Sequence, residues 1–91
     1  MTITARPTPN PNSLKFEVDG AAVIDDGLLA FHSLVEAAEH ELASELFALR
    51  GVESLMLVPE FVTVTKHAAA DWELLAAGVE AVLKEHLGGP S

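Results

Sequence analysis

Cysteine is absent from this sequence, and its absence removes several kinds of chemistry. Without a thiol the chain can form no disulfide, and it has no thiolate to act as a nucleophile or to bind zinc or an iron–sulfur cluster. Basic residues are also scarce, since five Lys and Arg stand against fourteen Asp and Glu and the formal net charge is −9. Because nucleic acids and anionic membranes attract proteins through Lys and Arg, we expect neither as a partner.

Long apolar stretches are missing as well. No segment approaches the roughly 18 apolar residues of a membrane span, and the first residues lack the apolar run of a signal peptide. A chain of 91 residues with 49% hydrophobic side chains suffices for one small domain with a thin core. We therefore expect a cytoplasmic monomer that forms a single domain over residues 1–91.

The first third of the sequence predicts a loop followed by strands. The segment Pro7–Ser13 contains three prolines and two asparagines, a composition typical of a rigid, extended loop. The segment Leu14–Val18 then alternates strictly between apolar and polar residues, which predicts a half-buried strand. A second, short strand fits Leu28–Phe31.

The clearest strand pair is predicted in the second half of the chain. The segment Val52–Val58 is almost continuously apolar, Phe61–Lys66 alternates, and Pro59-Glu60 between them suits a tight turn. In this hairpin Val62 and Val64 should face the core with the helices. The opposite side of the sheet should then carry Phe61, Thr63 and Thr65.

Two helices are predicted from caps and apolar periodicity. Ser33 and Glu36 have the spacing of a capping box, so the first helix should begin near Leu34, and Gly51 should end it. Its apolar stripe comprises Val35, Ala38, Leu42, Leu46 and Leu49. Asp71 is a suitable N-cap for a last helix, which Gly88-Gly89-Pro90 should stop. The order of elements predicts an α+β fold, a two-layer sandwich of a mainly antiparallel β-sheet with two helices packed on one face.

Several spaced motifs resemble one known family. They are the block Pro7–Phe16, Leu42-Ala43 with Leu46-Phe47 and Gly51-Val52, the strand Phe61–Lys66, and Asp71-Trp72. Together they resemble the N-terminal domain of Nfu/NifU-type iron–sulfur cluster scaffold proteins over nearly the whole chain. In that family the cluster ligands are a Cys-x-x-Cys pair in a separate C-terminal domain, and residues 1–91 contain no such domain. The resemblance therefore implies the fold and a context of iron–sulfur cluster maturation, without cluster binding by this domain and without a catalytic residue.

One departure from the family pattern lies in the first predicted helix. The family usually shows Ser-Pro just before the Leu-Ala pair, where this sequence has His40-Glu41. The loss of that cap and of the helix-starting proline suggests that the helix begins earlier here, at Ser33. We therefore expect one helix that continues from Leu34 to Arg50-Gly51.

The resemblance and the missing cysteines favour a noncatalytic protein-interaction module in iron–sulfur cluster assembly or delivery. Its partners would be assembly or client proteins, and no cofactor is expected to bind directly. The sequence offers neither a nucleophile elbow nor a glycine-rich phosphate loop, so we do not expect an enzyme. The alternative is a small protein that binds iron or another divalent metal through His and carboxylate ligands.

The candidate metal ligands for that alternative are His32, Glu36 and His40. Glu36 and His40 are four residues apart on the predicted helix and His32 lies just before it, and carboxylate plus imidazole at this spacing can bind a divalent metal. The competing interpretation is a solvated polar face with a favourable Glu–His pair, because a tight site needs a further ligand that the sequence does not indicate.

The candidate partner-binding residues belong to the proline-rich loop and to the side of the sheet without helices. They are Asn10, Asn12, Lys15, Phe61, Thr63 and Thr65. A rigid loop presents its amides at little entropic cost, and an exposed Phe with polar edges has the composition of a transient interface. Two alternatives stay open: the asparagines fix the loop through their own backbone, and the face is an ordinary wetted side of an antiparallel sheet.

Overall fold

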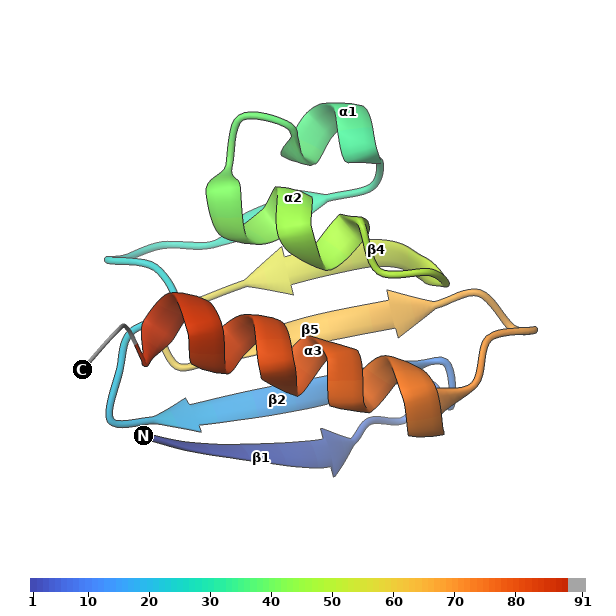
Figure 1. Cartoon of the computed structure of the whole chain (residues 1–91), viewed down its shortest axis with the longest axis horizontal. Helices are drawn as coiled ribbons and strands as arrows, with labels where there is room; N and C mark the ends of the chain where they lie inside the picture. The colour runs from blue at the N-terminus through green and yellow to red at the C-terminus, as the bar shows by residue number, and fades with distance from the viewer. Residues whose placement is uncertain (89–91) are drawn as a thin grey trace.

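One antiparallel sheet of five strands carries the helices in the computed structural model, which describes residues 1–88. The strand order is β1-β2-β5-β4-β3, and α2 and α3 lie on the same face of the sheet (Figure 1). The α+β two-layer prediction is thereby confirmed. The elements are β1 (Thr2–Pro7), β2 (Ser13–Asp19), β3 (Leu29–Phe31), α1 (Leu34–Ala37), α2 (Glu41–Phe47), β4 (Val52–Leu57), β5 (Phe61–Lys66) and α3 (Trp72–Leu87).

The predicted strands are present. The β4–β5 hairpin closes where it was expected, with Val58 N donating to Phe61 O at 3.1 Å across the turn. Strand β2 joins two hairpins, because it pairs with β1 on one side and with β5 on the other. Strand β1 was not predicted, because the alternation of apolar and polar residues in this segment is weak. None of the helices in residues 1–88 combines the length and the apolar character that crossing a bilayer requires.

The first helix differs from the prediction because it is interrupted. Ser33 caps α1 as expected, since its hydroxyl accepts from Glu36 N at 3.1 Å, but the Glu36 carboxylate accepts from His32 N at 2.7 Å instead of from Ser33. Helix α1 ends after one turn, and α2 begins with His40 as its N-cap. The His40 backbone is extended there, and its Nδ1 accepts from Ala43 N at 3.1 Å.

The interruption changes which residues of this region are buried. Val35 and Ala38, both predicted on the apolar stripe, are exposed, and Ala37 is buried instead. The two short helices make different contacts: α1 packs against β3, whereas α2 packs against β4 and α3.

The core lies between the sheet and the helices. The strands contribute the fully buried Phe16, Val62 and Val64, and the helices contribute Leu46, Val79 and Leu83. The inward direction predicted for Val62, Val64 and Leu46 is confirmed.

Helix α2 ends at Phe47, earlier than the predicted end at Arg50-Gly51. Gly51 does have the predicted left-handed conformation, with φ +102°, and a Cβ there would lie 2.7 Å from the Ala70 Cβ, so only glycine fits. Asp71 caps α3 by accepting from Glu73 N at 2.8 Å, as predicted. Gly88 is the C-cap of α3, and the rest of the predicted stop, Gly89-Pro90, lies outside the described residues.

Candidate functional site

The sheet face without helices carries a row of polar side chains from three neighbouring strands. The register places Arg6 of β1 opposite Lys15 of β2, and Lys15 opposite Thr63 of β5. Two residues further along β2, Glu17 lies opposite Phe61. The residues that alternate with these in β2 and β5 are buried against the helices, so the row faces away from the core. We call this surface the open face.

Charged contacts run across the open face. Arg6 Nε donates to Glu17 Oε1 at 2.6 Å, Glu17 Oε2 lies 3.6 Å from Lys15 Nζ, and Lys15 Nζ lies 4.4 Å from the centre of the Phe61 ring. The hydrogen bond from Arg6 lowers the pKa of Glu17 and raises the pKa of Arg6 itself. Because these groups are open to solvent, their pairing fixes the positions of the charges more than it stabilises the fold.

Phe61 is less accessible than predicted. It is half-buried instead of exposed, and the Lys15 ammonium lies over its ring, an arrangement typical of a cation–π contact. Thr63 and Thr65 are half-buried too, and the Thr65 hydroxyl lies 2.7 Å from the Ser13 hydroxyl. The open face therefore offers partly covered apolar atoms between hydroxyls and charges.

Sequence reasoning missed two members of this face. Arg6 was missed because β1 was not predicted, and Met56 of β4 was missed although the register places it opposite Thr63. Both could have been found only from the register of the β1–β2 and β4–β5 pairings, which decides which residues lie opposite one another. Met56 is half-buried and continues the open face toward β3.

The proline-rich loop at the rim is held by its own hydrogen bonds and by the helix side. Asn10 Oδ1 accepts from Asn12 N at 2.9 Å, which is an Asx-turn, and Pro11 O accepts from Trp72 Nε1 at 3.1 Å. Asn12 Oδ1 accepts from Lys66 Nζ at 3.2 Å. These bonds support the interpretation that the asparagines fix the loop. The side chain of Asn12 does so through Lys66, however, and not through the backbone of the loop. Asn10 is exposed.

Lys66 is a buried lysine that the sequence analysis did not consider. Its Nζ donates to Asn12 Oδ1, to His67 O at 3.3 Å and to Ala68 O at 3.4 Å, and it lies 5.9 Å from the centre of the Trp72 ring. The burial of Lys66 could have been predicted from the sequence. Lys66 is an even number of residues from Val62 in the same strand, so both side chains fall on the core side of β5.

The predicted metal ligands do not form a site. His32 Nδ1 lies 3.6 Å from Glu36 Oε1, but both side chains are exposed. His40 is engaged elsewhere, since its Nδ1 caps α2 and its ring packs against Phe31 with centroids 5.6 Å apart. The premise that Glu36 and His40 share one helix is wrong, because the helix is interrupted between them. Within residues 1–88 no group of three His, Asp or Glu side chains is placed to hold a metal ion.

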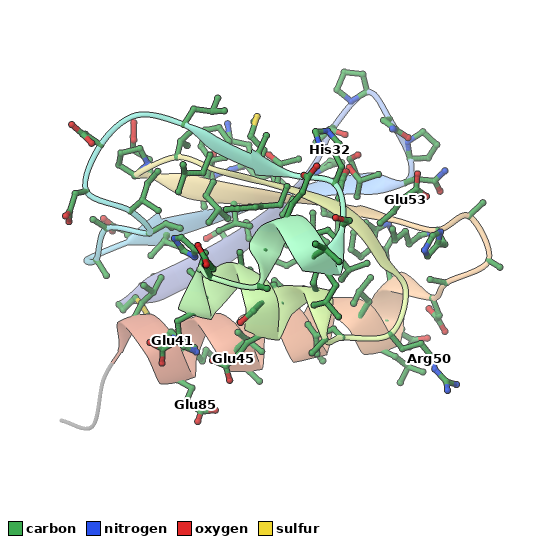
Figure 2. The ribbon with its side chains drawn as sticks, turned by 90° about the horizontal axis from the view of Figure 1, so that it is seen from above. His32, Glu41, Glu45, Arg50, Glu53 and Glu85 are labelled. Atoms are coloured by element: carbon green, nitrogen blue, oxygen red, sulfur yellow. The ribbon has the colours of Figure 1, made fainter. Side chains whose placement is uncertain are left out.

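Acidic side chains gather on the helix side of the molecule. Figure 2 shows Glu41 and Glu45 of α2 near Glu85 of α3, and Glu45 forms an ion pair with His86 of α3. His67 likewise lies 3.1 Å from a carboxylate oxygen of Glu53. These pairs use exposed or half-buried groups on the molecular surface.

A shallow hollow lies where the end of α2 meets the start of α3. Its volume is about 330 Å³, and its walls include Leu49, Arg50, Asp71 and Leu74. The Asp71 carboxylate is already used as the N-cap of α3. What remains is mainly apolar and offers no pair of groups suited to acid–base chemistry.

A family model described as "Scaffold protein Nfu/NifU N terminal" matches residues 3–89. The chain is 38% identical over 86 residues to the human mitochondrial NFU1 iron-sulfur cluster scaffold homolog, covering 93% of this chain and 34% of the human protein. It is 35% identical over 85 residues to the mitochondrial NifU-like protein 5 of Arabidopsis thaliana, of which it covers 30%. The chain thus spans about a third of the length of these curated relatives.

Solved structures of similar proteins have the same fold. The crystal structure of protein SAV1430 from Staphylococcus aureus matches with a TM-score of 0.74 and 26% identity, over 91% of this chain and 99% of that one. The solution structure of a NifU-like protein from Saccharomyces cerevisiae matches with a TM-score of 0.75 and 26% identity, over 92% of this chain and 76% of the yeast chain.

Proposed function

This chain belongs to the Nfu/NifU N-terminal domain family, and from that membership we propose that it is a noncatalytic protein-interaction module in iron–sulfur cluster assembly or delivery. The human relative is named an iron–sulfur cluster scaffold homolog. Because residues 1–91 contain no cysteine, the cluster in this proposal is held by another domain or protein. The module acts as a monomer that contacts assembly or client proteins.

The observation that carries the proposal is the composition of the open face. Arg6 and Lys15 are two of only five basic residues in a chain of net charge −9, and they lie together on the side that the helices leave uncovered. Between them and β4 lie the half-buried Phe61 and the hydroxyls of Thr63 and Thr65. Charges held in fixed positions beside apolar atoms lose little entropy when a partner docks.

The proline-rich loop forms the rim of the proposed interface. Asn10 is exposed and held in its turn, so its side chain is available at small entropic cost. Asn12 contributes mainly by fixing the loop through Lys66. The loop would therefore set the boundary of the interface, and Lys15 would lie nearer its centre.

The proposal also holds that the chain is not an enzyme. Its histidines have local structural partners: His40 caps α2, His32 pairs with Glu36, His67 with Glu53 and His86 with Glu45. None of these pairs borders the hollow near Asp71. A general base would need a reacting group within hydrogen-bond reach in a site that excludes water, and the described residues offer none.

The test replaces Lys15 by Glu and measures binding to a panel of purified cluster-assembly proteins and client apoproteins by biolayer interferometry. We expect the K15E variant to lose at least about tenfold in affinity for the panel member that binds the wild type, because it reverses the charge at the centre of the open face. The matched control is Lys84→Glu, since Lys84 is an exposed lysine on α3. The thermal midpoint of both variants should stay within a few degrees.

A second variant adds bulk to the open face without reversing its positive charge. Thr63→Lys places a longer side chain in the middle of the open face without removing a core residue, and we expect it to weaken binding as well. Phe61→Asp is less suitable because Phe61 is half-buried. Equal binding by wild type, K15E and T63K would contradict the proposed interface, and the absence of binding to every panel member would contradict the function.

A further inference from the structure

Four of the six large hydrophobic side chains that stay exposed within residues 1–88 come from one short segment. They are Leu28, Leu29, Leu34 and Val35, which are 57%, 39%, 54% and 86% exposed. Leu28 precedes β3 and Leu29 begins it, whereas Leu34 and Val35 belong to α1, which packs against β3. We call these four side chains the edge patch. Exposed apolar side chains on two elements that pack against each other are a common feature of interaction sites.

Strand β3 also has a free edge. It pairs with β4 on one side, and no other strand in the described part of the chain pairs with its outer side. Free edges present backbone N–H and C=O groups to which an extended peptide can add. Proteins usually protect such edges by keeping the strand very short, or with Lys, Pro or a bulge. The opposite edge of the sheet, β1, contains Arg6 and Pro7, whereas Leu29–Phe31 contains no such residue.

The shortness of β3 determines where the affinity would come from. A strand of three residues can form only a few backbone hydrogen bonds with an added peptide. The side-chain contacts with the edge patch must therefore supply most of the binding energy. Val35 is the most exposed member of the patch, so it has the largest exposed fraction to lose to a docked peptide.

The charge around the edge patch selects the kind of occupant. Asp25 and Asp26 precede the patch, Glu36 and Glu39 follow it, and no Lys or Arg occurs between Lys15 and Arg50. A second copy of the chain would bring these carboxylates against one another, which is unfavourable at a net charge of −9. A segment that carries Lys or Arg would meet opposite charges.

We propose that the free edge of β3 and the edge patch bind an extended, basic segment of a partner protein, which adds to the sheet as a sixth strand. Its apolar side chains would contact Leu29, Leu34 and Val35, and its Lys or Arg side chains would lie near the carboxylates that flank the patch. Strands β5 and β4 separate this surface from Lys15 on β2, so the inference goes beyond the proposed function and does not depend on it.

The test titrates the ¹⁵N-labelled protein with the synthetic peptide Lys-Val-Thr-Val-Thr-Val-Lys and follows the amide resonances. We expect saturable shifts in the segment 25–36 and slower hydrogen exchange of the β3 amides. Two control peptides should bind at least about tenfold more weakly. One replaces both Lys by Glu and tests the charge requirement, and the other replaces the central Val by Pro and tests strand addition.

Matched variants of the protein test the position of the site. Val35→Asn and Leu74→Asn each replace an apolar side chain by a neutral polar one at positions that are 86% and 78% exposed, so both variants should fold and keep the charge of the protein. We expect V35N to weaken peptide binding at least about tenfold and L74N to leave it unchanged. Absence of saturable shifts, shifts centred on Lys15 and Thr63, or equal binding by the two variants would overturn the inference. Concentration-dependent self-association through β3 would overturn it as well, because the occupant would then be a second copy.

Discussion

Replacing Lys66 by Met tests how the proline-rich loop is attached to the sheet. Lys66 Nζ donates to Asn12 Oδ1, His67 O and Ala68 O, and it lies 5.9 Å from the centre of the Trp72 ring. Methionine keeps an unbranched side chain of similar length in the same place but removes every one of these hydrogen bonds. The substitution therefore separates the polar anchor from the packing of the stem.

The expected magnitude follows from the geometry of the three bonds. Hydrogen bonds to charged groups contribute about 1.5–3 kcal/mol each when their geometry is good, but here the donor–acceptor distances are 3.2, 3.3 and 3.4 Å. The two backbone acceptors belong to exposed residues and can bond to water instead. Burying the ammonium also costs several kcal/mol, which methionine avoids. We therefore expect K66M to lower the free energy of unfolding by about 1–2 kcal/mol.

Trp72 makes the measurement direct, because it is the only tryptophan and lies beside Lys66. Urea denaturation followed by its fluorescence should show the loss, and the thermal midpoint should fall by about 4–8 °C per kcal/mol for a domain of this size. Lys84→Met on the exposed side of α3 is the control and should change stability by less than about 0.5 kcal/mol. If K66M were as stable as the wild type, the loop would be held without Lys66 and our reasoning would be refuted.

Two further predictions concern opposite faces of the sheet. Val64→Ala should lower the free energy of unfolding by about 2 kcal/mol, because Val64 is fully buried, whereas Thr63→Ala should change it little. Urea denaturation measures both changes. A loss below about 0.5 kcal/mol for Val64→Ala would mean that the wrong face was assigned to the core. Arg6→Ala should raise the pKa of Glu17, because the Arg6 hydrogen bond lowers it, and a carboxyl ¹³C NMR titration measures the change. Since the folded-state pKa of Glu17 is depressed, the pair stabilises the fold above the unfolded-state pKa, and this contribution disappears as the pH falls through the folded-state value. Identical titration curves in wild type and R6A would contradict the pair.

Local patterns predicted those parts of the fold that depend on neighbouring residues. The β4–β5 hairpin, the Asp71 cap and the direction of Val62 and Val64 could be predicted because alternation and capping act over a few residues. The prediction of one continuous helix from Leu34 was wrong, because the chain is extended at His40 and this histidine caps a second helix in place of the usual capping residue. The family pattern held the relevant signal, since α2 still begins at the position where relatives of this type show their Ser-Pro.

The candidate site was harder to predict because it depends on register. Lys15, Phe61, Thr63 and Thr65 were assigned to the uncovered side from alternation alone, and the strand pairing places them there. Arg6 and Met56 were not found in the same way, because β1 was not predicted and because the register of a strand pair decides which residues lie opposite one another. Whether these residues bind a partner remains a prediction for the binding experiments.

The strand order also has a consequence for how the chain folds. The β1–β2 and β4–β5 hairpins pair segments that are close in sequence, whereas β2 and β5 bring Ser13 and Thr65 together from distant parts of the chain. Isolated hairpins form in about 1–10 μs, but closing a long loop must precede any β2–β5 contact. We therefore expect the β2–β5 pairing to limit the folding rate, with α3 completing the core as Trp72 packs against Phe16 of β2.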